Sequence, residues 1–268
     1  MDHPELCLYE VDDRVATITF NRPDRMNGMI GNMEVAYYER LLQAQQDESV
    51  RAIVVTGSGK AWCPGADLAY RAGDGDEPLP NTRIPTTTPL DIGKPVIAAI
   101  NGACAGMGFG LALMCDFRIA AEGAKFTTAF SQRGLIAEYG LAWHLAHIAG
   151  RAVALDLLLT ARIVLAEEMA SLGLVNRVVP VGDVLFESVS FARTLADTSS
   201  PASMATIKRQ VLTETSMSAH DAMRAADALM VESLAGADVK EGITSFLEKR
   251  PVDFAPLGHG TTFGWMEE

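Results

Sequence analysis

The sequence predicts an α/β protein in which strand and helix units come first and helices alone follow. Three short apolar runs end in or near a glycine, namely 51–57 (RAIVVTG), 94–102 (KPVIAAING) and 117–123 (FRIAAEG). Continuous apolar runs of this length are typical of parallel strands buried on both faces. After Gly150 the apolar residues mostly follow helical spacing. The 268 residues, 49% of them hydrophobic, are enough for one large domain with a helical appendage, so we divide the chain into residues 1–200 and a C-terminal helical region, 201–268.

The N-terminal part is predicted to form a hairpin and then a helix. Residues 6–23 (LCLYEVDDRVATITFNRP) hold two short β-prone runs around Asp12 and Asp13, and Pro23 ends the second run. Helical spacing then relates four residues, Met33, Tyr37, Leu41 and Ala44. The hairpin is therefore expected to lead into an amphipathic helix.

A long loop and several helices are predicted in the rest of the chain. The segment from Arg71 to Asp91 is rich in Pro, Thr, Gly and Asp, which is typical of a surface loop, and loops of this length are usually functional or mobile. One amphipathic helix face is predicted from Leu185, Val189, Ala192 and Leu195. A further helix is expected to begin at Pro201, and a last one to end at Pro251.

Composition excludes several classes of function. The formal net charge is −12, which argues against non-specific binding of nucleic acid. The cysteines show neither CxxC spacing nor a zinc-like cluster, so we expect no metal site and no disulfide framework. The acidic N-terminus lacks the apolar run of a signal peptide, and the longest nearly apolar stretch, 107–115, has about half the length of a membrane span. We expect a cytoplasmic protein that does not enter a membrane.

Two glycine-rich segments follow predicted strands, 57–70 (GSGKAWCPGADLAY) and 101–116 (NGACAGMGFGLALMCD). Glycine lets the backbone approach a ligand and point N–H groups at it, and the start of a helix favours negative charge. The second segment has GxGxG spacing rather than the GxGxxG of dinucleotide sites. Tight turns and close helix packing would explain each segment separately. Together the segments suggest that two strand ends each offer one backbone N–H to the same oxygen atom, which is an oxyanion hole.

Five ordered motifs extend over nearly the whole chain: ITFNRPDRMN, AWCPGADL, NGACAGMGFGLALMCDFRIA, LGLVNRVVP and FLEKRP. On these motifs the sequence is identified as a member of the crotonase family, also called the enoyl-CoA hydratase/isomerase family. The resemblance implies a crotonase-like spiral of repeated ββα units with a C-terminal helical region that mediates trimerisation. It also implies acyl-CoA thioesters as substrates and a homotrimer or dimer of trimers. No separate cofactor is implied, because coenzyme A is part of the substrate.

The same resemblance assigns residues to roles. The family's oxyanion donors correspond to the backbone N–H groups of Ala66 and Met107, and its contacts to coenzyme A correspond to Ala66, Asp67 and Leu68. In relatives, the Phe and Lys of the last helix touch the nucleotide of coenzyme A bound to a neighbouring subunit, and here these residues are Phe246 and Lys249. A thioester carbonyl polarised in this way has an α-proton that a carboxylate can remove.

The carboxylates of two-base hydratases in this family are missing from this sequence. The resemblance places them at Gly110 and Phe130, and water addition usually needs a pair of acid and base groups. A standard hydratase mechanism is therefore not expected.

Glu138 is the replacement that the resemblance offers. The pattern F-S-x-x-G-L-I-x-E, which begins at Phe130, resembles peroxisomal-type Δ3,Δ2-enoyl-CoA isomerases. In that group a single Glu moves a proton from C2 to C4, so the resemblance assigns Glu138 as the acid/base. Its neighbours Leu135, Ile136 and Tyr139 are expected to shield its carboxylate from water.

Three alternatives stay open for Glu138 and for the chain. Glu138 with an ordered water would hydrate a 2-enoyl-CoA. A homologue that binds acyl-CoA without catalysis would retain both glycine-rich segments and an inert Glu138, and an exposed loop acid would have no role in chemistry.

His144 and His147 are three residues apart on a predicted helix, and we expect a polar patch or a subunit contact there, because a metal site needs more ligands.

Overall fold

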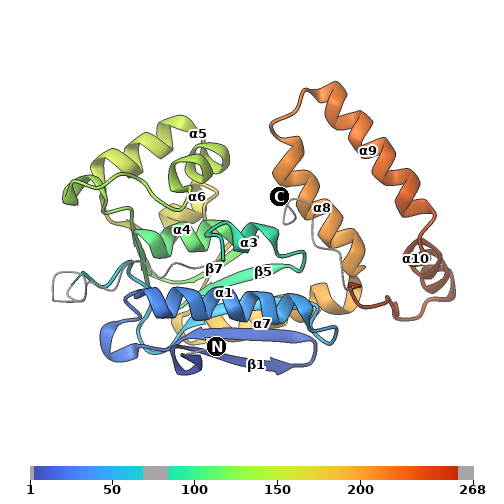
Figure 1. Cartoon of the computed structure of the whole chain (residues 1–268), viewed down its shortest axis with the longest axis horizontal. Coiled ribbons are helices and arrows are strands. Elements are labelled where there is room, and N and C mark those ends of the chain that lie inside the picture. The colour runs from blue at the N-terminus through green and yellow to red at the C-terminus, as the bar shows by residue number, and fades with distance from the viewer. Residues whose placement is uncertain (1–2, 69–83, 259–268) are drawn as a thin grey trace.

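The computed structural model describes residues 3–68 and 84–258, and the strands of these residues are divided between two sheets (Figure 1). The larger sheet has the strand order β1-β2-β3-β5-β7-β10, and these strands span Cys7–Asp12, Val15–Phe20, Ala52–Gly57, Val96–Ile100, Phe117–Ala121 and Arg177–Val179. The smaller sheet has the order β4-β6-β8-β9, and its strands span Ala61–Cys63, Ala103–Ala105, Lys125–Thr127 and Val164–Leu165.

From β3 to β8, successive strands alternate between the two sheets. β3, β5 and β7 pair in parallel within the larger sheet. The strand that follows each of them, β4, β6 or β8, pairs in parallel within the smaller sheet. A helix then precedes the next unit, as α4 does after β6. This repetition of two strands and a helix is the predicted spiral of ββα units, so the α/β crotonase-like fold class is confirmed.

Helices surround the sheets and then continue alone. Those of the core are α1 Gly31–Gln46, α3 Thr88–Asp91, α4 Met107–Met114, α5 Leu141–Thr160, α6 Ala166–Ser171 and α7 Val184–Thr198. The C-terminal ones are α8 Pro201–Glu214, α9 Ala219–Leu234 and α10 Ala237–Glu248. Short 3-10 turns occupy Pro4–Leu6, Pro23–Arg25, Ser131–Arg133 and Val181–Asp183. Every residue of α4 is buried, as expected for a helix that is apolar on all sides.

Most predicted elements are confirmed. β1 and β2 form the antiparallel hairpin, and the three apolar runs form β3, β5 and β7. The predicted apolar face of α1, made of Met33, Tyr37, Leu41 and Ala44, is buried. α8 begins at Pro201, where the Ser200 side chain accepts the N–H of Ser203 as an N-cap. The last helix ends shortly before Pro251.

Three local features differ from the predictions. Residues 71–83 of the predicted loop lie outside the described residues, and within its remainder Thr88–Asp91 form α3. The buried face of α7 consists of Val184, Ser188, Ala192 and Ala196. Leu185 is exposed, because α7 packs on the larger sheet through these small residues and turns the larger side chain outward. The short strands β4, β6, β8, β9 and β10 were not located in the sequence, since strands of two or three residues show no periodicity.

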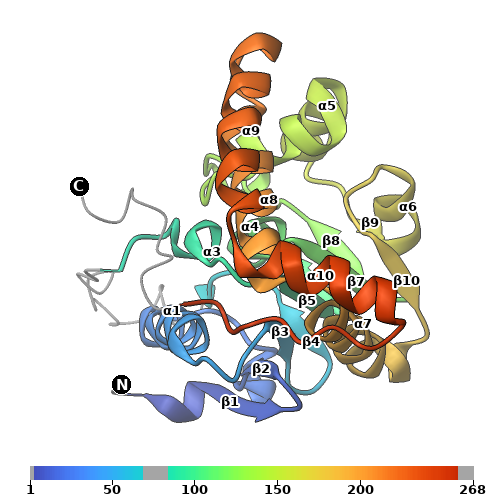
Figure 2. The same cartoon turned by 90° about the vertical axis from the view of Figure 1, so that its right-hand side faces the viewer.

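The C-terminal helices α8, α9 and α10 form an arm beside the core (Figures 1 and 2). Lys208 on α8 makes a 2.8 Å ion pair with Asp116, just before β7. No residue of α9 is buried, although the helix carries several apolar side chains. Residue 200 directly precedes α8, and the division into two domains at that point stays a prediction. Among the helices of residues 3–68 and 84–258, none combines the length and apolar character that crossing a membrane requires.

Candidate active site

Three parallel strands of the smaller sheet end at one edge, and a predicted catalytic residue follows each of them. β4, β6 and β8 are parallel neighbours. Ala66 comes after β4, Met107 comes after β6, and Glu138 lies in the segment between β8 and α5. The carboxyl ends of parallel strands in α/β proteins usually form the ligand site. The topology therefore gathers the three segments that carry the predicted catalytic residues.

Gly65 and Gly106 bring the first two segments into contact. Their φ angles are +105° and +53°, a region that glycine adopts readily and other residues rarely do. A β-carbon on Gly65 would lie 3.0 Å from the carbonyl oxygen of Ala105 and 3.7 Å from Cα of Gly106. A side chain on Gly65 would push the segments apart. Because Ala66 and Met107 directly follow the two glycines, the predicted oxyanion donors are neighbours in space.

The hydrogen bonds around Ala66 and Met107 orient their N–H groups. In the bridge between Ala66 and Met29, the N–H of Met29 donates to the Gly65 carbonyl at 2.8 Å, and the N–H of Asp67 donates to the Met29 carbonyl at 2.9 Å. These two bonds use the carbonyl of Gly65 and the N–H of Asp67. The N–H of Ala66 therefore points away from Met29. Met107 begins α4, and its N–H is therefore among the donors that a helix leaves unpaired at its start. Both N–H groups are suited to the predicted oxyanion hole.

The start of α4 is packed directly onto β4. A β-carbon on Gly108 would lie 2.2 Å from the carbonyl oxygen of Cys63 and 2.9 Å from its Sγ, so only glycine permits this approach. The Cys63 thiol is fully buried, and this desolvation raises its pKa to about 12. The thiol therefore stays protonated near neutral pH and is not a nucleophile. Cys63 supports the site through packing.

Glu138 lies in the segment that joins β8 to α5 and is half-buried. Its carbonyl accepts the N–H of Leu141, the first residue of α5, at 3.0 Å. Leu135 is 50% exposed and Ile136 is 86% exposed. The expectation that these two residues shield Glu138 is therefore wrong for the single chain, because residues 131–136 run along its surface.

Tyr139 packs inward and connects Glu138 to α4. A β-carbon on Gly110 would lie 2.8 Å from Cβ of Tyr139, so Tyr139 rests on the first turn of α4. This turn begins with Met107. Glu138 is consequently held close to the start of the helix that supplies one predicted oxyanion donor.

A buried cluster of one carboxylate and two phenols was not predicted. The hydroxyl of Tyr139 donates to Oε1 of Glu34 at 2.9 Å, and the hydroxyl of Tyr38 donates to the same oxygen at 2.9 Å. Glu34 is only 9% exposed. The signal in the sequence was an acidic residue beside Met33 on the apolar face of a predicted helix. We use the name phenol cluster for Glu34, Tyr38 and Tyr139.

Asp67 and Leu68, the other predicted contacts to coenzyme A near Ala66, have different environments. The carboxylate of Asp67 makes a 3.1 Å ion pair with Arg22, and the Arg22 guanidinium also donates to the Gly28 carbonyl. Asp67 therefore anchors its segment to the chain before α1. Leu68 is exposed and leaves its side chain available for a ligand.

Phe246 and Lys249 lie at the end of α10, in the C-terminal arm (Figure 2). Phe246 is 81% exposed, which is unusual for a large aromatic side chain. Lys249 caps the helix in a left-handed conformation with φ 55°. The resemblance assigns both residues to coenzyme A on a neighbouring subunit, and this assignment stays a prediction.

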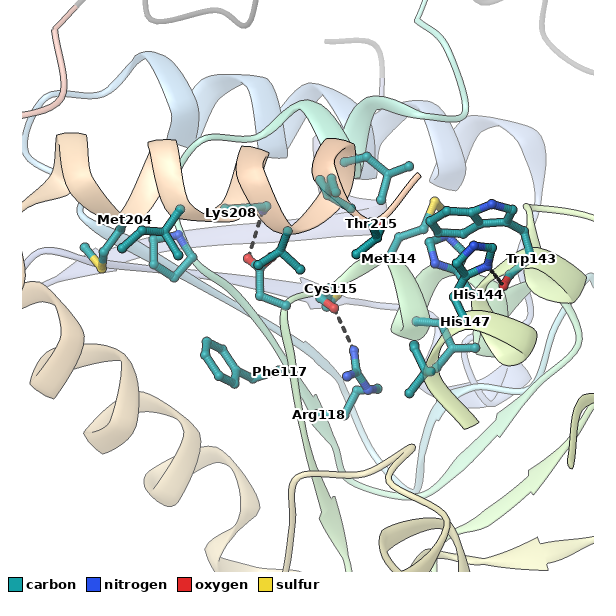
Figure 3. Close-up of a pocket in the computed structure, with 18 of the residues that line it drawn as sticks. Met114, Cys115, Phe117, Arg118, Trp143, His144, His147, Met204, Lys208 and Thr215 are labelled. Carbon is teal, nitrogen blue, oxygen red and sulfur yellow. Dashed lines mark hydrogen bonds and ion pairs between the residues drawn. The ribbon is translucent and has the colours of Figure 1, made fainter. Parts of the chain in front are cut away.

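A cavity of about 650 Å³ lies at the other end of α4 (Figure 3). Its wall is mostly apolar, with Met114, Phe117 and Met204 among its residues. Its charged side chains are Arg118 and the ion pair between Lys208 and Asp116. Met114 ends the helix that Met107 begins, about 10 Å further along the axis at 1.5 Å per residue. The cavity is lined by none of the predicted catalytic residues.

His144 and His147 line this cavity together with Trp143 (Figure 3). The Trp143 ring stacks on His147 with 3.9 Å between centroids and meets His144 edge-on at 5.0 Å. Burial lowers the pKa of His144 to about 4, and the nearby charge of Arg118 acts in the same direction. Within the described ranges, no group of three or more His, Cys, Asp or Glu side chains is arranged to hold a metal ion.

Known proteins identify the family of the chain. Residues 10–256 match the family described as enoyl-CoA hydratase/isomerase. The 1,2-epoxyphenylacetyl-CoA isomerase of Escherichia coli K12 is 36% identical over 93% of this chain and 98% of its own length. A probable enoyl-CoA hydratase of Rhodobacter capsulatus is 37% identical over 92% and 96%. The crystal structure of a probable enoyl-CoA hydratase/isomerase from Mycobacterium abscessus matches with a TM-score of 0.86 at 30% identity, over 94% of this chain and 99% of that chain. The chain therefore belongs to the enoyl-CoA hydratase/isomerase family, whose members act on acyl-CoA thioesters.

Proposed function

We propose that this enzyme moves the double bond of an enoyl-CoA, with Glu138 as its single acid/base. The observation that carries the proposal is the placement of Glu138. It directly precedes Tyr139, which rests on the first turn of α4, and Met107 begins that helix. The positions of the two hydratase carboxylates are occupied by Gly110 and Phe130. One carboxylate beside the oxyanion donors is sufficient for isomerisation.

The proposed reaction starts with the thioester carbonyl accepting hydrogen bonds from the N–H groups of Ala66 and Met107. Each donor would stabilise the developing oxyanion by roughly 3–4 kcal/mol. The Glu138 carboxylate removes a proton from C2 of a 3-enoyl-CoA, and the electron pair forms a dienolate. The protonated Glu138 then returns the proton to C4, the double bond comes to lie between C2 and C3, and the carboxylate is regenerated. The reaction needs neither a second base nor a change in oxidation state.

We propose further that coenzyme A is bound partly by a neighbouring subunit of a homotrimer or a dimer of trimers. Leu68 would contact it beside the oxyanion hole, and Phe246 and Lys249 of the neighbour would contact its nucleotide. The support is the apolar surface of the arm. Large apolar side chains are exposed on α9 and α10, namely Met223, Met230, Val231, Leu234, Ile243, Phe246 and Leu247. Surfaces of this kind usually mark protein interfaces.

Hydration of a 2-enoyl-CoA is the second candidate, with Glu138 activating an ordered water. It is favoured by the name of the Rhodobacter capsulatus relative, a probable enoyl-CoA hydratase. The Escherichia coli relative is named an isomerase, so the names of relatives do not decide between the two reactions.

Incubation with a panel of 2-enoyl- and 3-enoyl-CoA thioesters distinguishes the candidates. Isomerisation conserves the mass of the substrate and moves its double bond, whereas hydration adds the mass of one water. We expect 3-enoyl-CoA to become 2-enoyl-CoA. Addition of water to 2-enoyl-CoA without isomerisation would favour the hydratase, and binding without any turnover would indicate a non-catalytic homologue.

A further inference from the structure

The phenol cluster connects two parts of the active site that are distant in sequence. Glu34 lies in the first turn of α1, five residues after Met29, which is bridged to Ala66. Tyr139 directly follows Glu138 and packs on Gly110 of α4. The hydrogen bond between Tyr139 and Glu34 therefore ties the segment that carries Glu138 to α1, and the chain just before α1 is bridged to Ala66.

The two phenols of the cluster allow the Glu34 carboxylate to be buried. A buried carboxylate without hydrogen bonds is strongly disfavoured. Oε1 of Glu34 accepts two phenol hydrogen bonds of 2.9 Å. Burial, together with the Glu34 charge, raises the pKa of Tyr38, so this phenol stays protonated and remains a donor. Tyr38 is on the same helix, one turn after Glu34, whereas Tyr139 is 105 residues away.

The backbone at Tyr139 is in a conformation that it would not adopt without support. Its φ is +54°, and Gly140 follows with φ +64°. The left-handed region is disfavoured for residues with a β-carbon, and it persists where the surrounding structure holds it. The contact with Gly110 fixes the base of the Tyr139 side chain, and the bond to Glu34 fixes its hydroxyl.

We propose that Glu34 is a positioning residue that fixes the carboxylate of Glu138 through Tyr139. The inference rests on the proposed function, in which Glu138 transfers the proton. Glu34 acts by holding the Tyr139 hydroxyl and takes no part in proton transfer itself. Because misplacement by about 1 Å can reduce a rate by as much as 100-fold, a hydroxyl that holds the neighbour of the base affects the rate of proton transfer.

The test measures exchange of the α-protons of butyryl-CoA in heavy water, which reports on proton abstraction and does not depend on the reaction that follows. Tyr139→Phe removes one hydroxyl and keeps the ring. It should slow exchange by roughly 10- to 100-fold while leaving the Kd for butyryl-CoA unchanged. Tyr38→Phe is the matched control, since it removes the other hydrogen bond to the same oxygen of Glu34. It should exchange at the wild-type rate even if its melting temperature falls as far as that of Tyr139→Phe.

Two further variants separate the possible failures. Glu34→Gln keeps an acceptor oxygen for Tyr139 and should retain most of the exchange. Exchange by Tyr139→Phe at the wild-type rate, while Glu138→Gln is inactive, would overturn the positioning role and leave the proposed function intact. Equal slowing by Tyr139→Phe and Tyr38→Phe, or loss of exchange in Glu34→Gln, would also overturn it. Wild-type exchange by Glu138→Gln would overturn the proposed function, and the positioning role with it.

Discussion

The β-carbon of Tyr139 occupies the space into which a side chain on Gly110 would extend, since a β-carbon on Gly110 would lie 2.8 Å away from it. Gly110 therefore has a packing role in α4. Its lack of a β-carbon lets the segment that carries Glu138 lie directly on the helix that Met107 begins. At a position to which the resemblance assigns a carboxylate of two-base hydratases, this enzyme has a glycine covered by a tyrosine.

Gly110→Ala should reduce both stability and activity. Alanine is normally favoured over glycine inside a helix by about 0.5–1 kcal/mol, but overpacking in a core costs about 1–3 kcal/mol. The contact of 2.8 Å makes the second effect the larger one. We expect a lower free energy of unfolding in urea and a lower kcat, because Tyr139 and Glu138 are displaced. Gly182→Ala is the control, since a β-carbon on Gly182 would meet nothing within 4 Å. Unchanged stability in Gly110→Ala would show that Tyr139 can move without cost.

Features of this site that follow from the local sequence of a single segment were predictable. Each glycine-rich segment follows an apolar strand, and parallel neighbours end at the same edge of a sheet, so the proximity of Ala66 and Met107 was predictable. The phenol cluster was not predictable, because Tyr139 and Glu34 are 105 residues apart and no local pattern relates them. The environment of Leu135 and Ile136 was also missed. Apolar side chains beside an acid suggest shielding, but the path of the backbone exposes both.

Contacts between distant segments, which no local pattern reveals, also explain the errors in the fold prediction. Periodicity located α7, but Ser188 is on its buried face and Leu185 is exposed. Hydrophobicity alone ranks Leu185 as the better core residue, whereas close packing of a helix on a sheet favours the smaller side chain. Such a choice depends on the distance between elements, which a single sequence does not provide.

His144 should make the folded protein less stable in mild acid. Its pKa is lowered from 6.5 to about 4 by burial, with a contribution from the charge of Arg118. Below pH 6.5 the unfolded chain takes up a proton at this residue that the folded chain does not, so the free energy of unfolding decreases as pH falls from 6.5 to 4. The full effect is about 3 kcal/mol, since one pKa unit corresponds to about 1.4 kcal/mol.

Urea unfolding between pH 4.5 and 7, at one protein concentration, measures this effect. His144→Phe keeps an aromatic ring but does not titrate, and it should flatten the dependence on pH. His220→Phe, at an exposed position on α9, should leave the wild-type slope in place. A slope that persists in His144→Phe would assign the dependence on pH to other groups.

Lys249→Ala should weaken the binding of acyl-CoA and reduce its sensitivity to salt. In the proposed assembly the ammonium group pairs with a phosphate of coenzyme A, and salt screens exposed pairs of this kind. We expect a loss of about 1 kcal/mol, or roughly fivefold in Kd, because the partner is solvent-exposed. Titration calorimetry at several salt concentrations measures both quantities. Lys240→Ala, on the same helix, is the control for general electrostatic effects, and equal results for the two variants would show that the nucleotide lies elsewhere.

The enzyme should sediment as a trimer or a hexamer. α9 has no buried residue in the single chain, while Val231 and Leu234 on it are exposed. Val231→Asp leaves the packing of the single chain unaffected but would place a charge in the expected interface, so it should shift the protein towards smaller species. Sedimentation velocity with a parallel activity assay measures this effect. A wild-type monomer that is stable and fully active would contradict the assembly.

Glu138→Gln should abolish most of the catalysis and preserve binding. Glutamine keeps the shape of the side chain but cannot accept the α-proton, and a positioned acid/base group usually contributes roughly 10²- to 10⁴-fold to the rate. The Kd for acyl-CoA should persist, because Ala66 and Met107 hold the thioester oxygen through their backbone N–H groups, which the substitution does not change. Exchange of the α-proton in heavy water should stop together with isomerisation, since both begin with the same abstraction. If the variant still exchanges this proton at the wild-type rate, the base is another residue. Gly110 and Phe130 provide none at the positions used by two-base hydratases, so the search would then begin with Glu34, the carboxylate that the phenol cluster holds beside the site.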